Sequence, residues 1–471
     1  MHRWSHIRGL RAAPRYKIIT ARTCYRPLMT DSAVHPVDRG LPAGRLALLG
    51  LQHMSIMYAG SVAVPLIVGS ALKLDAATIG LLVNADLLVA GIATLIQAVG
   101  IGKLLGIRLP VVAGATFTVV NPMILIAAQY GLPAVYGAML ASGVFGLLIA
   151  KPFAKLIRFF PPLVTGTLLL VIGVSLLGPG AAMIAGHDTT SPDYAAPSHI
   201  GLAFGVLALL VLFTRVLRGF ANQIGPLLAL AIGLVVAIPM GLVHWDGLRA
   251  AGWFGLASPF HFGAPTFPVA AILSMCVVML VTFTESTADM IAVGEITGRP
   301  PTDADLARGL ATDGVSAVLG GVMNSFPDTA FAQNVGLVRM TGVRSRWVVA
   351  VTGGILVLMG LVPKVGAFIA AIPEPVIGGV AVVMFAMVAA VGAQNLRMVE
   401  FSGNHNTFVV AVALGVGLLP AFAPDFFKHF PAWLQTICGS SITVAAVLAF
   451  VLNLLFNHLG RRSEPDLLKA P

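Results

Sequence analysis

Long apolar runs separated by short polar stretches dominate the chain from residue 46 to residue 458. The hydrocarbon core of a bilayer is about 30 Å thick and needs roughly 20 apolar residues in each spanning helix. The pattern predicts fourteen such segments, near residues 46–69, 78–100, 107–128, 132–150, 161–178, 199–214, 224–244, 268–294, 308–323, 329–342, 346–362, 366–391, 404–419 and 436–458. Two of them are poor continuous helices, because residues 107–128 contain two prolines and residues 329–342 are short, polar and preceded by Pro327.

The composition excludes a water-soluble fold. Of the 471 residues, 57% are hydrophobic and only 10% are charged, whereas a soluble domain has about 25% charged residues. The three cysteines, Cys24, Cys276 and Cys438, lie far apart and form no metal-binding or redox spacing. The sequence therefore predicts an all-α protein embedded in the lipid bilayer.

The positions of the cations predict the topology. With both termini in the cytoplasm, 25 of the 29 Lys and Arg residues fall on inner segments, and the outer loops keep only Lys73, Arg249, Lys364 and Lys428. Cytoplasmic loops of membrane proteins collect Lys and Arg in this way. We expect an even number of spans with both termini cytoplasmic, and we interpret the net charge of +10 as topology rather than nucleic-acid binding.

The two ends of the chain are polar. Residues 1–28 contain seven Lys and Arg and no acidic residue, which fits either a disordered basic arm or a targeting presequence. We expect residues 1–45 to form a cytoplasmic arm without a cleavable signal, since no apolar run follows the arginines. Residues 459–471 are the predicted cytoplasmic tail.

An internal repeat indicates the architecture. Residues 160–167 read FPPLVTGT and residues 372–379 read IPEPVIGG, and a similar offset relates the two broken segments. Seven spans per half, an odd number, place the repeats, residues 46–244 and 268–458, in opposite orientations. Inverted repeats with broken segments are typical of secondary transporters with a substrate site near the bilayer midplane.

Ionisable side chains inside spans are costly and mark functional sites. Here they are His53, Asp86, Glu285, Asp289 and Asp313, with Glu374 at the mouth of a span. Glu285 and Asp289 stand four residues apart and share one helix face. Two neighbouring carboxylates in apolar surroundings cannot both ionise at low cost, which is typical of a proton site. The alternative for each residue is a polar contact that only holds helices together.

The second broken segment offers groups for a planar ligand. Gln333 and Asn334 supply adjacent amides where a helix begins, and Phe331 supplies a flat apolar face. Amides and an aromatic ring suit a hydrogen-bonding heterocycle better than an inorganic ion. Capping of the helix N-terminus by Asn334 is the alternative interpretation.

These motifs together resemble those of the nucleobase-ascorbate transporters, also called xanthine/uracil permeases or nucleobase:cation symporter-2. The run from Gln333 to Gly342, QNVGLVRMTG, is similar to the family signature Q-N-x-G-x4-T. Further matches are Gln52 with His53, the Gly114–Phe117 stretch, Glu285 with Asp289, and Asp313. The resemblance covers roughly residues 40–460.

The resemblance implies fourteen spans in two inverted seven-span repeats, with short strands in spans 3 and 10. It divides the spans into a core domain, residues 46–150 plus 268–362, and a gate domain, residues 161–244 plus 366–458. The gate domain of such proteins usually forms a homodimer.

The resemblance also implies a binding site. Glu285 and Gln333 would bind a purine through their side chains and Phe117 and Ala332 through backbone groups, with Phe117 and Phe331 flanking the ring. The other implied substrate-binding residues are Thr116, Asn334 and Asp289, of which Thr116 tunes xanthine against uric acid. Glu285, Asp313 and His53 would support coupling to H⁺, and no other cofactor is expected. Asp86 has no role in this scheme.

The expected function is proton-coupled uptake of xanthine or uric acid across a bacterial-type inner membrane, with the core moving against the gate. A uracil or other nucleobase symporter stays open, although uracil carriers tend to have Glu in place of Gln333. An anion carrier of the same fold is a second alternative. A membrane enzyme is a third, but the spans contain no H-E-x-x-H, no G-x-S-x-G and no His/Cys cluster.

Overall fold

The computed structural model describes residues 34–186, 190–402 and 405–459. The predicted basic arm up to residue 33, including Cys24, and residues 460–471 of the predicted tail lie outside the described residues. Every helix and strand that the structure describes belongs to one unit, Pro36–Pro471.

The fold is predominantly helical. The described elements of the first half are α1 (Ala43–Ser61), α2 (Ala63–Ala71), α3 (Ala76–Val99), β1 (Ala113–Ala115), η1 (Phe117–Val119), α4 (Val120–Tyr130), α5 (Leu132–Leu156), η2 (Ile157–Phe159), α6 (Pro162–Ser175), α7 (Leu177–Ala185), α8 (Pro197–Val216), α9 (Phe220–Gln223), α10 (Gly225–Ala237) and α11 (Asp246–Ala250). Those of the second half are α12 (Val269–Thr297), α13 (Asp303–Met323), β2 (Asp328–Ala330), α14 (Ala332–Thr341), α15 (Arg346–Gly360), α16 (Pro363–Ala370), α17 (Glu374–Leu396), α18 (Asn406–Phe422), η3 (Pro424–Phe427), α19 (Ala432–Cys438), α20 (Ser441–Asn453) and η4 (Leu454–Leu459).

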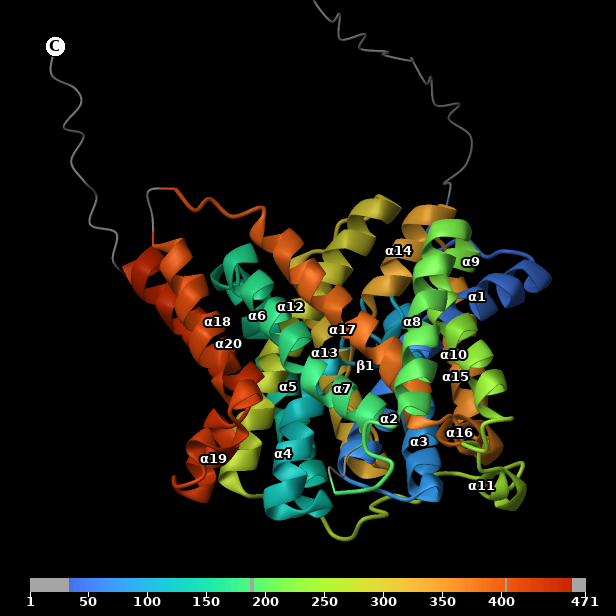
Figure 1. Cartoon of the computed structure of the whole chain (residues 1–471). Helices are drawn as coiled ribbons and strands as arrows, with labels where there is room; N and C mark the ends of the chain where they lie inside the picture. The colour runs from blue at the N-terminus through green and yellow to red at the C-terminus, as the bar shows by residue number, and fades with distance from the viewer. Residues whose placement is uncertain (1–33, 187–189, 403–404, 460–471) are drawn as a thin grey trace, which may run out of the picture. The chain divides into compact units, whose positions relative to one another are not determined.

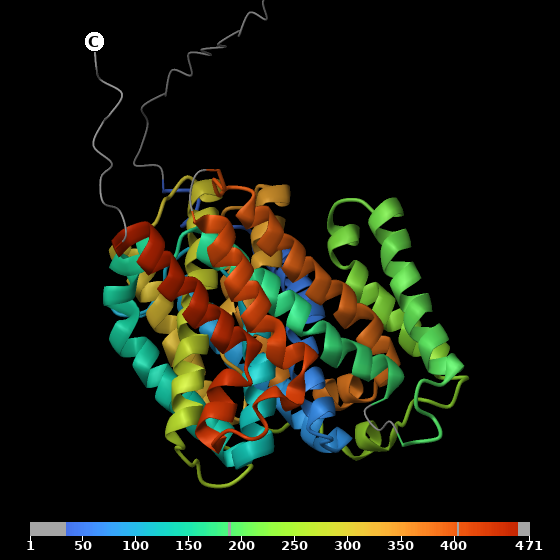
Figure 2. The same ribbon diagram turned by 60° about the vertical axis from the view of Figure 1, so that its left-hand side comes forward.

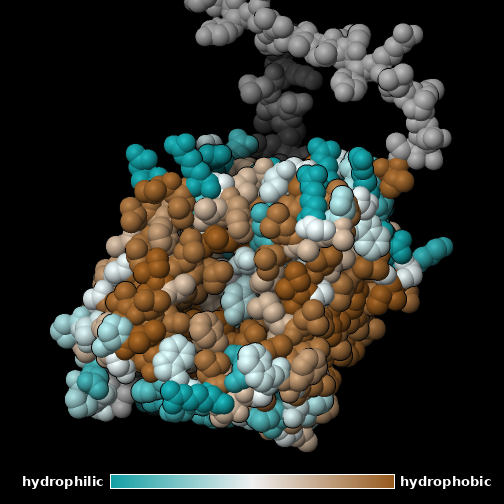
Figure 3. All heavy atoms as spheres, turned by 90° about the vertical axis from the view of Figure 1, so that its right-hand side faces the viewer, coloured by the Kyte–Doolittle hydropathy of each residue, from teal (hydrophilic) through white to brown (hydrophobic). Residues whose placement is uncertain are grey.

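Length and hydropathy confirm a protein that spans the membrane several times. Among the described residues, eight helices can cross a bilayer, or nine when α15 and α16, bent by 79°, are counted as one span. Three further predicted segments are shorter apolar helices, Phe117–Tyr130, Gly225–Ala237 and Asn406–Phe422. The two remaining predicted segments correspond to α13, which contains four charged residues, and α14, which has 10 residues. Apolar side chains cover the middle of the face in Figure 3, and hydrophilic side chains gather at its two ends.

One predicted helix boundary is wrong, and a proline explains it. The predicted segment 366–391 is divided between α16 and α17, because Pro373 precedes the first turn of α17 and disfavours a continuous helix. The predicted segment 46–69 is confirmed as one apolar span, Ala43–Ala71, with a break in its helix at Val62. Pro65 lacks the N–H group that would bond to the carbonyl of Ser61, so α1 ends there.

The two broken segments meet as a pair of short strands. β1 and β2 are antiparallel, with Ala113 opposite Ala330 and Ala115 opposite Asp328. Strands were expected in both segments, and β2 begins one residue before the predicted start at 329. From this pair, α4 leads toward one end of the membrane-spanning bundle and α14 toward the other (Figure 1). The two half-helices therefore have opposite orientations.

Helices from the two halves pack closely on each other. A Cβ atom on Gly91 of α3 would lie 2.6 Å from the backbone nitrogen of Val357 on α15. A Cβ atom on Gly143 of α5 would lie 2.7 Å from the backbone nitrogen of Val318 on α13. Small residues allow such approach between membrane helices. α17 likewise packs along α6, and Figure 2 shows the orange and green helices side by side.

Candidate functional site

The side chain of Glu285 is fixed at the end of β1. Thr118 Oγ1 donates a hydrogen bond to Glu285 Oε1 at 2.8 Å, and Thr116 Oγ1 donates to Oε2 at 3.1 Å. Thr116 also accepts a bond from the N–H of Thr118, which leaves its own hydroxyl hydrogen free to point at the carboxyl. The strand end and the turn that follows it therefore form a cradle for a carboxyl group of α12.

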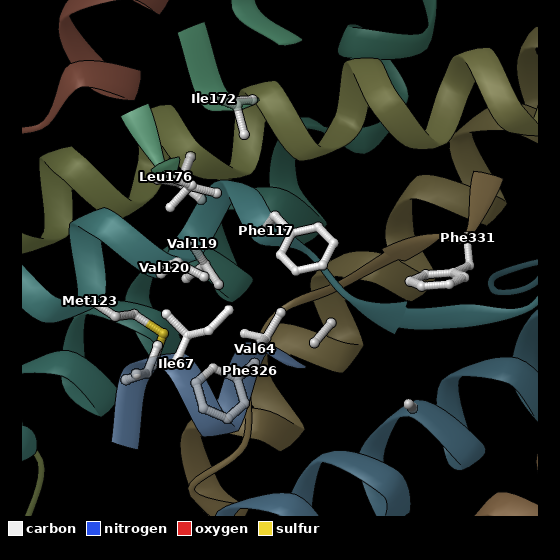
Figure 4. Packing of buried hydrophobic residues seen from close by; sticks show 14 of the residues in the cluster. Val64, Ile67, Phe117, Val119, Val120, Met123, Ile172, Leu176, Phe326 and Phe331 are labelled. Carbon is white, nitrogen blue, oxygen red and sulfur yellow. The ribbon is translucent and has the colours of Figure 1, made fainter. Parts of the chain in front are cut away.

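Two aromatic rings project from the segments beside the strands (Figure 4). Phe117 is buried, and its ring meets Phe385 of α17 edge-on at a centroid distance of 5.4 Å. Phe331 is buried against two glycines, Gly60 of α1 and Gly114 of β1. A Cβ atom on Gly60 would lie 2.5 Å from the Phe331 ring, so this position accommodates the ring only because it carries no side chain.

Asn334 and His53 are joined by hydrogen bonds. Asn334 Nδ2 donates to the carbonyl of His53 at 2.9 Å and lies 3.0 Å from its Nδ1. Both side chains are buried, and Asn334 Oδ1 has no hydrogen-bond partner within the described part of the chain. The alternative interpretation of Asn334 as a helix cap is wrong, because α14 begins after Phe331.

The other predicted acidic residues have different surroundings. Asp289 lies one helical turn beyond Glu285 on α12 and is half-buried. Asp313 of α13 is buried, and its Oδ1 accepts a 3.2 Å bond from Gln97 of α3. The structure thus brings Asp313 to α3 and His53 to α14, and it forms no hydrogen bond from either to Glu285 among the described residues.

Gln333 opens onto a largely apolar cavity that also has several polar side chains in its wall. The cavity has a volume of about 670 Å³, and its lining includes Gln333 of α14, Gln223 of α9 and Arg215 of α8. Gln223 lies against Gly336 of α14, and its Oε1 has no partner among the described residues. Ala332, at the start of α14, is also exposed. The region after β2 is therefore reachable from one end of the bundle.

The sequence alone did not identify several residues at the site. Thr118 of η1 holds Glu285, and two hydroxyl groups so close together, Thr116 and Thr118, in an apolar segment were a possible signal of a buried polar contact. Gln223 lies in a short connection without a motif. Gln97 occurs near the end of a mostly apolar helix, which was a signal of a buried polar contact. In the described residues, no three His, Cys, Asp or Glu side chains form a group that could hold a metal ion.

A polar site between two oppositely directed half-helices inside an apolar bundle is typical of membrane transporters. Residues 44–426 match the family model Xan_ur_permease, described as the permease family. The chain belongs to this family of xanthine/uracil permeases, which confirms the resemblance seen in its motifs. As a permease it is a transporter and not an enzyme.

Its relatives include transporters of oxidised purines. The chain is 43% identical to the uric acid transporter UacT of Escherichia coli strain K12 over 442 residues, 93% of this chain and 91% of that protein. It is 42% identical to the xanthine permease of Bacillus subtilis strain 168 over 421 residues, 89% of this chain and 96% of that protein. The transmembrane domain of the cyanobacterium bicarbonate transporter BicA has a similar fold, with a TM-score of 0.58 and 13% identity over 89% of this chain and 98% of that one.

Proposed function

We propose that the protein imports xanthine or uric acid together with protons. The observation that carries this proposal is the Glu285 carboxyl held by two threonine hydroxyls at a broken segment. The names of the relatives, a uric acid transporter and a xanthine permease, supply the substrate class.

The proposed chemistry uses donor and acceptor edges of a purine. The Glu285 carboxylate accepts hydrogen bonds from ring N–H groups, and the Gln333 amide pairs with an edge that has one donor and one acceptor. Backbone groups of Phe117 and Ala332 complete the contacts, and the Phe117 and Phe331 rings flank the purine. Thr116 reaches the substrate from the cradle of Glu285.

Asn334 and Asp289 complete the proposed site. The unpartnered Oδ1 of Asn334 gives this side chain one acceptor for the substrate, while its Nδ2 group holds His53. Asp289 lines the pocket one turn beyond Glu285. The acids Glu285 and Asp313, with His53, exchange the coupled proton in this proposal, and H⁺ is the only coupling ion.

The proposed architecture has fourteen spans with both termini on the cytoplasmic side of a bacterial-type inner membrane. The proposed count is supported by the eight long helices, the bent pair α15–α16, the three shorter apolar helices, α13 and α14, each of which lies near one predicted segment. The first and second repeats contribute a core, residues 46–150 plus 268–362, and a gate, residues 161–244 plus 366–458. The gate forms the homodimer contact.

Contacts at the two ends support an alternating-access cycle. The cavity at Gln333 is also lined by Arg215, a residue of the predicted cytoplasmic side. At the predicted outer side, Ser70 of α2 donates a hydrogen bond to Glu374 of α17, which joins the proposed core to the proposed gate. This combination of an inner cavity and an outer contact fits an inward-open state, and movement of the core against the gate would reverse it.

Equilibrium binding to purified protein in detergent tests the substrate assignment. We expect xanthine and uric acid to bind, and uracil, bicarbonate and sulfate to bind far more weakly. Proteoliposomes should then take up protons when xanthine or uric acid is added. Saturable binding of bicarbonate with no purine binding would instead make the protein an anion carrier.

Gln333→Glu sharpens the same test. The substitution removes an amide donor and adds a negative charge near the acids of α12, so purine affinity should fall and uracil should compete better than before. Gln223→Glu, which places the same change in the cavity on α9, is the matched control. An unchanged purine profile in Gln333→Glu would remove Gln333 from the binding site.

A further inference from the structure

Two buried carboxyl groups lie behind the strand pair and take no part in the proposed binding of substrate. Asp86 of α3 is 0% exposed and Asp328 of β2 is 1% exposed. Asp328 stands opposite Ala115 in the strand register. Ser61 Oγ donates to Asp86 Oδ2 and also accepts from the N–H of Ala115, so Asp86 lies against the strand residue that Asp328 opposes.

Serine hydroxyls donate hydrogen bonds to one carboxyl oxygen of each aspartate. Ser61 Oγ donates to Asp86 Oδ2 at 2.9 Å, and Ser316 Oγ donates to Asp328 Oδ2 at 2.5 Å. The Oδ1 atoms of both aspartates have no hydrogen-bond partner among the described residues. Ser325, which is 0% exposed, lies beside Asp86 and supplies a further hydroxyl for its carboxyl. Two carboxyl oxygens of the pair, one on each aspartate, therefore remain for a shared proton.

No cation compensates these acids in the described part of the chain. The charged and titratable group that faces Asp86 is Asp328, and those that face Asp328 are Asp86 and Asp313 of α13. The ion pairs of the described residues lie elsewhere, as with Arg346 and Asp38. Two adjacent uncompensated negative charges in a membrane interior are very costly. One proton between two carboxyls removes one charge and allows an O–H of one to donate to the other.

We propose that Asp86 and Asp328 bind one proton between them and form a proton site separate from Glu285. The unpartnered Oδ1 atoms are the places for the shared hydrogen, and the serine hydroxyls stabilise the one remaining charge. The proposed proton site does not depend on the identity of the substrate. Only its effect on transport rests on the proposed function.

The pair is linked to the Glu285 cradle through β1. Ser61, which donates to Asp86, accepts a 2.9 Å bond from the N–H of Ala115. The next residue, Thr116, donates to Glu285. Loss of the shared proton would alter the bond from Ser61 and so the position of the strand end that holds Glu285.

The second repeat contains a matching arrangement. Ala330 of β2 donates its N–H to Ser286 Oγ at 2.9 Å, and Ser286 lies beside Asp313. Ser61 with Asp86 in the first repeat thus corresponds to Ser286 with Asp313 in the second. This correspondence gives Asp86 a place in the fold that the sequence motifs did not supply.

Infrared spectroscopy of the purified protein in lipid tests the proposal directly. A protonated carboxylic acid has a C=O stretching band that is distinct from that of a carboxylate and shifts in D₂O. We expect Asp86→Asn and Asp328→Asn each to retain the band area of one acid at a shifted frequency, because the remaining buried carboxyl keeps the single proton. The double variant should lose that area. Loss of one acid's area in each single variant, which means two protonated acids, or no loss in the double variant, would overturn the proposal.

Two further variants keep the test decisive if an Asn variant fails to fold. Ser61→Ala keeps both acids and should retain the band area but shift its frequency, since one donor to the pair is gone. An unshifted spectrum in Ser61→Ala would count against the pair. Asp425→Asn is the matched control, because Asp425 is exposed and should contribute no acid band.

Replacement of the buffer cation and measurements of transport supply two independent tests. Replacing choline by sodium should leave the melting temperature of the wild-type protein unchanged. A sodium-specific rise that Asp86→Asn abolishes would assign the pair to a metal cation instead. In proteoliposomes, uptake by Asp86→Asn should depend less steeply on pH than wild-type uptake, and an identical profile would contradict the link to Glu285. If the wild-type protein binds no purine but shows the expected bands, the proposed function fails and the proton site stands.

Discussion

At the scale of single residues, Glu285 is the side chain on which substrate binding depends most. Hydrogen bonds to a charged group contribute about 1.5–3 kcal/mol each, so loss of two bonds to a purine weakens affinity by about 10²-fold or more. Glu285→Gln keeps the side-chain volume but cannot ionise, and its NH₂ group would face a substrate donor. We expect normal membrane abundance with purine binding and uptake abolished, measured with radiolabelled xanthine and uric acid.

Two variants calibrate this prediction. Glu285→Asp should retain partial uptake with weaker binding, because the charge remains while its reach shortens. Glu295→Gln makes the same change at the exposed end of α12 and should leave uptake unaltered. Wild-type accumulation by Glu285→Gln would mean that the carboxyl only holds helices together.

Thr118 offers a second test at this scale. Thr118→Val removes the 2.8 Å bond to Glu285 Oε1 with almost no change in volume. A bond to a charged group is worth about 1.5 kcal/mol at the lower end, so purine affinity should fall about tenfold while the amount of folded protein stays constant. Thr297→Val is the control, because its hydroxyl bonds only to its own helix. Equal binding constants for the two variants would separate Thr118 from the site.

The residues that sequence reasoning could identify are those whose burial is costly. Glu285 and Asp313 were identified because ionisable groups in apolar helices are rarely retained without use. Thr118 and Ser61 were not, since a hydroxyl in an apolar segment costs little and is common. Asp328 also escaped notice, because the polar residues around it concealed that the strand is buried. The partner of Asn334 could not be predicted, because His53 approaches only through the packing of α1 on α14.

At the scale of elements, the contact between α1 and the second broken segment depends on Gly60. Gly60→Ala would place a Cβ atom 2.5 Å from the Phe331 ring, which must then move. Overpacking of this kind costs about 1–3 kcal/mol. We expect a lower melting temperature and weaker purine binding. Gly44→Ala on the same helix has nothing within 4 Å and should change neither property. Weaker binding in both variants, or in neither, would contradict the role of this contact.

Prolines and polarity made the broken segments visible in the sequence, but not their pairing. The prolines and short apolar length of residues 107–128 and 329–342 predicted discontinuity, and both segments contain a strand. Their register depends on contacts between the two halves, such as the N–H of Phe331 with the carbonyl of Val112. The break between α15 and α16 falls near the predicted boundary between residues 362 and 366, whereas the break between α16 and α17 was missed because apolar residues continue up to Pro373.

At the scale of the whole molecule, the distribution of cations predicts which loops face outward. In a background without the native cysteines, Cys substitutions at Lys73 and Lys428 should react with an impermeant maleimide added to intact cells. Substitutions at Lys155 and Arg344 should react only after the membrane is opened. All four positions are exposed, so burial cannot account for the difference. Labelling of Lys155→Cys or Arg344→Cys in intact cells would refute the fourteen-span topology.

The contact between α2 and α17 permits a test of the movement between core and gate. Ser70 and Glu374 are hydrogen-bonded at the predicted outer side, so the pair Ser70→Cys and Glu374→Cys should cross-link with a short bifunctional reagent. Because the link would hold the outer side closed while the cavity at Gln333 stays open, purine binding in detergent should persist and uptake should stop. A cleavable reagent should restore uptake on reduction.

A matched pair decides whether the contact itself matters. Ser70→Cys with Arg397→Cys places the second cysteine beyond the opposite end of α17, about 34 Å away by helix length, so the same reagent should neither join the two helices nor alter uptake. If the Ser70–Glu374 link forms and uptake continues at the wild-type rate, α2 and α17 need not separate during transport. The proposed movement of the core against the gate would then be wrong, even though the assignment of Glu285 to the substrate would still stand.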